Sequence, residues 1–242
     1  MNWQRKSCSE RLHMDTLKKK LVKLEKAELI AIIQHMLLQE PDLQWLLATP
    51  LPTASSLKAS IDPKLYQQQI VAAMSAEDHQ LKRKRGEVER RLTAIKSIAD
   101  EFAAQEQYAA ALTIYEVLIT EVIKHFNSYQ DEYIAFCVIL VGCIDGLDSC
   151  FAGEEDNPQM RLRVMRALFA IYRFYTDSGM DLDEDIPGLL VGNSTPEERQ
   201  VIAGWIRDSV AEAKGAKWSS NSRLQRYSTF LFALEKDKKD HE

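Results

Sequence analysis

Apolar residues recur at helical spacing along most of the chain, and most clearly between Ile95 and Leu118. There they fall at i, i+3, i+4 and i+7, which is the stripe that an amphipathic helix buries. A polar turn near 105–107 divides the stripe into two faces, which are Ile95, Ile98, Ala99 and Phe102, then Ala111, Tyr115 and Leu118. The small side chains of Ala99 and Ala111 allow two helix backbones to approach closely. The pattern therefore predicts an antiparallel helical hairpin.

The offsets between these residues resemble those of a tetratricopeptide repeat. The likeness is partial, because Ile123 stands where that repeat usually has a closing proline. One repeat length further on, the key positions hold Glu132, Tyr133 and Asp145, so no second copy is readable. Stacked repeats need about three units to bury a continuous core. The resemblance therefore implies one tetratricopeptide-like, solenoid-like hairpin within an irregular all-helical fold, with a repeat array as the alternative.

Helix-start signals mark further elements on both sides of the hairpin. Asp62 precedes Pro63, and Thr195 precedes Pro196, so each pair offers a capping side chain and a proline at the first helical position. Periodic apolar residues predict helices at about 17–24, 29–37, 41–47, 63–80, 131–151, 158–176, 195–206 and 219–236. Only 9 Gly and 7 Pro interrupt these segments, and strand-like alternation is hard to find. The sequence predicts an all-α protein built of irregular antiparallel helical hairpins.

The same signals suggest one domain with a small N-terminal helical subdomain. We expect a loose N-terminal arm at 1–14, the subdomain at 15–48 and the helical-hairpin body at 61–242. The segment 49–60 between them contains two prolines and several Ser and Thr residues, which is typical of a linker.

Composition favours a soluble chain. It has 242 residues, of which 45% are hydrophobic and 28% are charged, enough to build one sizeable core. Apolar runs such as 134–144 are shorter than the roughly twenty residues that cross a membrane. The N-terminus is polar and charged, unlike a signal peptide. We expect a cytoplasmic protein with no membrane partner.

No pattern of metal ligands stands out. The four cysteines are Cys8, Cys137, Cys143 and Cys150, and they form neither a CxxC nor a CxC pair. We expect the last three to be small core residues. Acidic residues at Asp181, Asp183, Glu184 and Asp185 imitate the start of a calcium loop. However, Ile186 and Gly192 occupy the positions of the required glycine and glutamate, which favours an ordinary solvated loop. We expect no metal.

Catalytic signatures are missing as well. The chain contains no glycine-rich phosphate loop, no nucleophile elbow and no HExxH motif, and its five histidines are isolated. Glu116 and Glu121 are five residues apart, which does not suit a helical di-metal pair. Catalytic groups can also converge from distant helices, but the local pattern favours a protein that is not an enzyme and has no cofactor.

Several segments resemble the helical region of bacterial SWIM zinc-finger proteins. Three of them lie in the first part of the chain, at 27–29, 40–43 and 61–63. The other four lie in its last third, at 179–190, 195–205, 218–220 and 227–235. The zinc finger of that family requires a CxC followed by a CxH, and this chain has neither. The resemblance therefore implies an accessory helical region, or a fragment of a longer zinc-finger protein, and carries over no zinc site.

Charge is distributed unevenly. Residues 1–91 contain 16 Lys and Arg against 11 Asp and Glu, whereas residues 92–242 contain 15 against 25. Basic residues cluster before the hairpin at Lys82, Arg83, Lys84, Arg85, Arg90 and Arg91. Such clusters can neutralise phosphates, so a nucleic-acid-binding module is one hypothesis, whereas a solvated helix face is the plainer interpretation.

The hypothesis that the sequence favours is a non-catalytic helical scaffold that binds another protein. Aromatic side chains are frequent anchors at protein interfaces. Phe102, Tyr108 and Tyr115 lie on the hairpin, and we expect them to line a partner groove. The accessory nucleic-acid-binding module remains the alternative.

Overall fold

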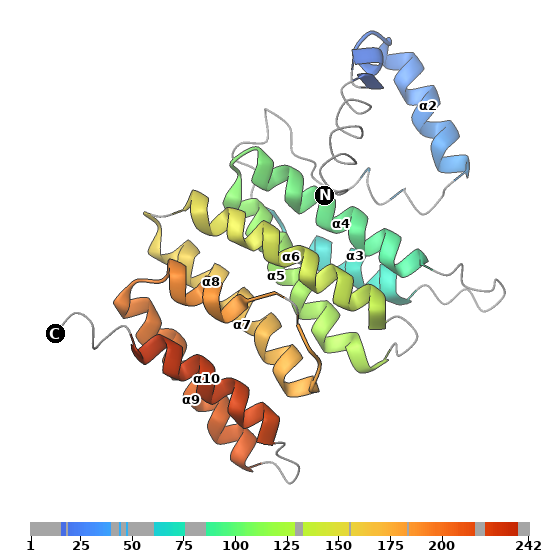
Figure 1. Ribbon diagram of the computed structural model, residues 1–242. Coiled ribbons are helices and arrows are strands. Elements are labelled where there is room, and N and C mark those ends of the chain that lie inside the picture. Colours follow the sequence, from blue (N-terminus) through green and yellow to red (C-terminus); the bar gives the residue numbers. More distant parts are fainter. Residues whose placement is uncertain are drawn as a thin grey trace. The chain divides into compact units, whose positions relative to one another are not determined.

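The computed structural model describes residues 16–17, 19–39, 44, 47, 61–75, 86–128, 133–154, 156–182, 184–215 and 221–236. All regular secondary structure within these ranges is helical, which confirms the all-α class. The chain divides into two compact units, Met1–Pro50 and Leu51–Glu242 (Figure 1). The predicted arm at 1–14 and linker at 49–60 lie outside the described residues.

The first unit contains α2, Lys26–Gln39. Ahead of it, the backbone N–H of Glu25 donates to the carboxylate of Glu28 over 2.8 Å, which satisfies one of the unpaired donors at a helix start. None of the residues of α2 is buried. Ile30, Ile33 and Met36 are each more than 40% exposed.

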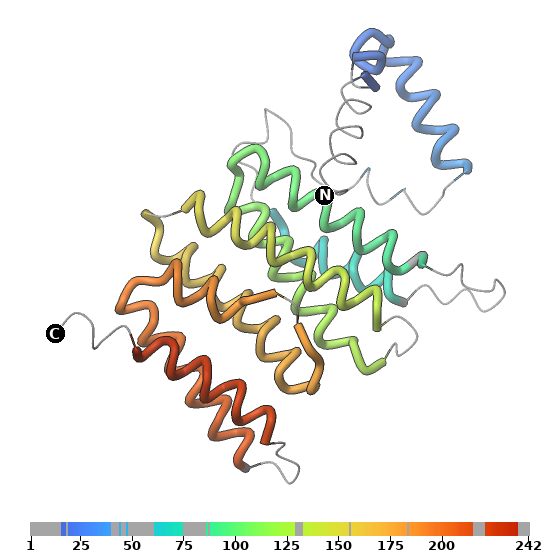
Figure 2. The backbone as a smooth tube through the Cα atoms, viewed as in Figure 1, coloured from blue at the N-terminus to red at the C-terminus, as the bar shows by residue number. Residues whose placement is uncertain are grey.

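The second unit is a series of packed helices. They are α3 (Pro63–Ser75), α4 (Glu87–Ala104), α5 (Tyr108–His125), the short 3-10 helix η2 (Phe126–Ser128), α6 (Tyr133–Gly153), α7 (Pro158–Ser178), α8 (Ile186–Asn193), α9 (Pro196–Gly215) and α10 (Asn221–Lys236). From α4 to α7, helices contact their neighbours in sequence, and α4 also contacts α6 while α5 contacts α7. At the C-terminal end, α9 and α10 lie side by side (Figure 2).

The predicted hairpin is α4 and α5. The turn between them lies at 105–107, where the N–H of Gln107 donates to the carbonyl of Phe102 over 2.9 Å. Both predicted apolar faces are buried, and Ala99 and Ala111 have no exposed surface. The spacing of small and large apolar residues therefore identified the contact between these helices correctly.

Helix α6 is long and strongly apolar. It alone among the described helices is long and apolar enough to cross a membrane by length and composition, with a mean hydropathy of 2.0, and half of that stretch is buried inside the fold. Its buried side includes Phe136, Leu140 and Leu147. Core packing therefore accounts for much of its composition.

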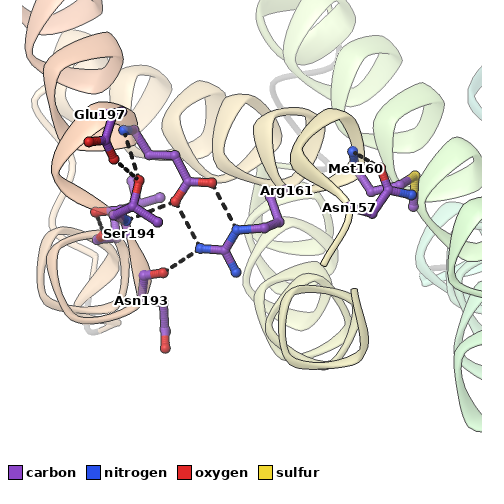
Figure 3. A network of polar contacts seen from close by, with 9 residues as sticks. Asn157, Met160, Arg161, Asn193, Ser194 and Glu197 are labelled. Atoms are coloured by element: carbon purple, nitrogen blue, oxygen red, sulfur yellow. Dashed lines mark hydrogen bonds and ion pairs between the residues drawn. The ribbon is translucent and has the colours of Figure 1, made fainter. Parts of the chain in front are cut away.

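A buried ion pair joins α7 to the start of α9. The guanidinium of Arg161 donates two hydrogen bonds of 2.8 Å to the carboxylate of Glu198 and a third, of 2.6 Å, to the carbonyl of Asn193 at the end of α8 (Figure 3). The Arg161 and Glu198 side chains are only 10% and 16% exposed. The Phe151 ring lies 4.4 Å from the guanidinium and covers it.

The same glutamate caps α9. Its carboxylate accepts a hydrogen bond of 2.8 Å from the N–H of Thr195, whose hydroxyl accepts one of 3.3 Å from the N–H of Glu198. This reciprocal arrangement is a capping box, and it is readable in the sequence as Thr-x-x-Glu. One side chain therefore begins a helix and anchors that helix to α7.

Arg161→Met tests this anchor. Removing one partner of a buried pair leaves the other charge uncompensated, so we expect the free energy of unfolding to fall by about 3 kcal/mol. Urea unfolding monitored by circular dichroism measures the change. Arg207→Met is the matched control, because its pair with Glu235 is 57% and 47% exposed and should contribute less than about 1 kcal/mol. Equal losses in the two variants would contradict the assignment.

Acid should weaken the same anchor. The hydrogen bonds from Arg161, with that from Thr195, hold the pKa of Glu198 below its ordinary value. The ionised Glu198 carboxylate therefore contributes its full stabilisation above the unfolded-state pKa of about 4.3. This stabilisation is lost as the pH falls through the lower folded-state pKa. We expect the stability difference between the wild type and Arg161→Met to shrink below about pH 4. Urea titrations at several pH values measure it, and a constant difference would contradict the prediction.

Candidate binding groove

An open cavity of about 800 Å³ lies between α7, α8 and α10. A second cavity, of about 380 Å³, adjoins it and shares Tyr172, Asp185, Pro187 and Arg226 with it. Together we call them the α8–α10 groove. Its volume falls in the range of ligand-binding sites, roughly 300–1,000 Å³.

One wall of the groove is α8. The carboxylate of Asp185 caps this helix by accepting a hydrogen bond of 2.9 Å from the N–H of Gly188, and Pro187 occupies the first turn. A Cβ atom at Gly188 would lie 2.2 Å from the capping carboxylate, so a side chain there would require the carboxylate to shift. A Cβ atom at Gly192 would meet nothing within 4 Å, because it would project into open space. The wall is therefore largely backbone.

The other wall is α10. It contributes polar and small residues spaced three or four apart, which are Ser222, Gln225, Arg226, Thr229 and Ala233. The groove also reaches two aromatic rings, Tyr172 on α7 and Phe230 on α10, which meet edge to face at 5.0 Å. Both rings are more than 90% buried. The two rings therefore form a buried floor, and the apolar surface that the groove itself exposes comes from Pro187, Val191 and Ala233, which are half-buried.

Acidic residues surround one mouth of the groove. Asp181, Glu184 and Asp185 are exposed and line it, whereas Arg226 is the lining residue of opposite charge. The guanidinium of Arg226 already donates to the carboxylate of Asp181 and, over 2.6 Å, to the carbonyl of Met180. The mouth therefore presents net negative charge.

A second charge cluster holds α10 against α7. Asp177 accepts a hydrogen bond of 2.6 Å from the Tyr227 hydroxyl and forms ion pairs with Arg223, at 2.7 Å, and Arg173, at 3.3 Å. Burial, together with the hydrogen bond to Asp177, raises the pKa of Tyr227 well above its ordinary value. The hydroxyl therefore stays protonated and acts as a structural donor.

The chemistry of the groove suits binding. Its lining contains hydroxyls, an amide, carboxylates and one guanidinium, but neither histidine nor cysteine. Within the ranges that the structure describes, no three His, Cys, Asp or Glu side chains are grouped to hold a metal ion. Asp183 of the acidic loop lies outside those ranges.

The structure places two of the three aromatic residues of the predicted partner groove in the interior. Phe102 is 1% exposed and Tyr115 is 0% exposed, so neither offers a surface to a partner. Tyr108 is half-buried, and its ring occupies the space where a Cβ atom of Gly153 would lie. These positions are internal contacts of the helical body.

Tyr115 instead completes a polar contact between three helices. Its hydroxyl donates to Asp100 over 2.6 Å, and the Lys96 ammonium lies 2.8 Å from the same carboxylate. Burial, followed by the hydrogen bond to Asp100, raises the pKa of Tyr115 far above its ordinary value. A Cβ atom at Gly146 on α6 would lie 2.2 Å from the Tyr115 hydroxyl oxygen, so that glycine makes room for the tyrosine.

The predicted basic cluster is described only in part. Lys82, Arg83, Lys84 and Arg85 lie outside the described residues. Arg90 and Arg91 lie in the first turn of α4, where Arg90 is exposed and Arg91 is half-buried. Nucleic-acid binding through this cluster therefore stays a prediction.

Of the cysteines, Cys143 and Cys150 are buried as expected, while Cys137 is half-buried. Burial raises the pKa of both buried thiols to about 12. Such thiols remain protonated and unreactive at neutral pH.

The chain was compared with protein-family models, curated proteins and solved structures, and none of them matches it. The resemblances to the SWIM-associated helical region and to a tetratricopeptide hairpin therefore stay predictions.

Sequence reasoning missed the groove because it missed α8. A helix-start signal was present, because Asp185 is followed two residues later by Pro187. This resembles the start of α3, where Pro63 directly follows Asp62. The helix has only eight residues and includes a proline and two glycines, so neither periodicity nor propensity marks it.

Glycine-to-alanine substitutions distinguish the packed positions from the open ones. Gly146→Ala forces a methyl group against the buried Tyr115, so we expect a loss of about 1–3 kcal/mol in stability from overpacking. Gly192→Ala meets open space in a helix, so we expect a gain of up to about 1 kcal/mol. Thermal and urea unfolding measure both changes. Equal effects would show that the Tyr115 contact is not tight.

Proposed function

We propose that this protein is a non-catalytic interaction module that binds a segment of another protein in the α8–α10 groove. The observation that supports this proposal is an open groove that exposes the apolar side chains of Pro187, Val191 and Ala233 and has polar groups around them. Protein interfaces have the same anatomy, with an apolar centre surrounded by polar groups.

Rigid support adds to the case. The acidic loop is fixed through Arg226, α10 is fixed through the Asp177 cluster, and the C-terminal end of α8 is fixed by Arg161 and Arg199, which donate to the carbonyls of Asn193 and Val191. A preformed groove orders few groups on binding and therefore loses little conformational entropy. These contacts favour a binding site that exists before the partner arrives.

Filling the groove should abolish binding. Gly192→Trp places an indole in open space, so we expect it to fold and to block the site. Gly204→Trp on α9 is the matched control, because a Cβ atom there also meets nothing within 4 Å and Gly204 does not line the groove. Affinity capture from host lysate, with and without nuclease and identified by mass spectrometry, compares both variants with the wild type.

The expected result is a defined set of proteins that survives nuclease, is retained by Gly204→Trp and is reduced about tenfold or more by Gly192→Trp. Equal capture by both variants would contradict the groove as the binding site. Partners that vanish with nuclease would instead support the alternative hypothesis, in which the basic cluster binds nucleic acid.

A further inference from the structure

We propose that the occupant of the α8–α10 groove is an amphipathic helix whose apolar face is flanked by Lys or Arg residues. This inference rests on the proposed function and names the chemical class of the partner. The shape of the groove supports the helix, and the charge of its mouth supports the basic flank.

The helical form follows from the walls. Adding a strand requires a sheet edge with unpaired backbone groups, and the described residues contain no strand. Recognition of polyproline segments uses exposed aromatic rings, whereas Tyr172 and Phe230 are 8% and 2% exposed and lie at the floor. A groove between two helices that exposes Pro187, Val191 and Ala233 instead fits the mode in which an amphipathic helix lays its apolar face into the groove.

Close approach of such a helix is possible along α8. Pro187, Gly188, Val191 and Gly192 lie at i, i+1, i+4 and i+5, so they share one side of the helix and all line the groove. At Gly192 no side chain lies between the backbone of α8 and the occupant, whereas the Asp185 carboxylate takes up the space beside Gly188.

The basic flank follows from the mouth. Asp181, Glu184 and Asp185 oppose only one cation among the lining residues, and Arg226 already pairs with Asp181. A second cationic group beside the apolar face would reduce this excess negative charge. An acidic flank would meet like charges and be rejected, because complementary potentials select partners at an interface.

Two designed 18-residue peptides test the inference. They share one leucine face, and they carry either Lys or Glu at the flanking positions. Fluorescence anisotropy with the full-length chain measures the affinity of each peptide. Four variants accompany the wild type. Glu184→Lys reverses a charge at the mouth, and its control Asp208→Lys makes the same change on the exposed surface of α9. Gly192→Trp blocks the groove, and Gly204→Trp is its control.

We expect the Lys peptide to bind about tenfold tighter than the Glu peptide. Glu184→Lys should reduce that preference at least threefold whereas Asp208→Lys should leave it unchanged, and Gly192→Trp alone should abolish binding. Equal affinity of the two peptides, no binding of either, or binding that survives Gly192→Trp would each overturn the basic-helix assignment. The capture experiment distinguishes this failure from failure of the proposed function, because a protein lost only with Gly192→Trp would still show that the groove binds partners.

Discussion

The C-terminal half of the structure depends on the buried pair between Arg161 and Glu198. Burying two charges is unfavourable unless their hydrogen bonds are satisfied, and here Arg161 reaches both the carboxylate and the Asn193 carbonyl while Glu198 also caps α9. The pair therefore specifies one arrangement of α7, α8 and α9, because any shift between them would leave a charge unpaired.

That constraint explains how α8 can be a wall of the groove. An eight-residue helix with two glycines has little intrinsic stability. The Asp185 cap fixes its start, and Arg161 and Arg199 bind the carbonyls near its end. Helix ends held from outside the helix replace the side-chain packing that its glycines cannot supply, and this is why the groove beside them can remain open.

The sequence predicted the fold better than the groove. The α4–α5 hairpin was readable because its core face is local and periodic, so every residue of the stripe became buried. The same property made Phe102 and Tyr115 poor candidates for a partner site. The apolar residues that reveal a helix in the sequence are the ones that become buried in the core, so they are not available to a partner. The groove brings together Tyr172, Gly192 and Phe230 from three separate helices. No local pattern in the sequence indicates that these residues lie close to one another.

Two sets of glycines show where this fold is closed and where it is open. On α6, the spaces beside Gly146 and Gly153 are filled by Tyr115 and Tyr108 from α5, so the missing side chains tighten the core. On α8, the space beside Gly192 is filled by nothing in the described chain. Glycine costs helix stability in both places, but only on α6 does an internal contact offset that cost. Because Gly192 lines the groove, a recognition surface on α8 would account for this glycine.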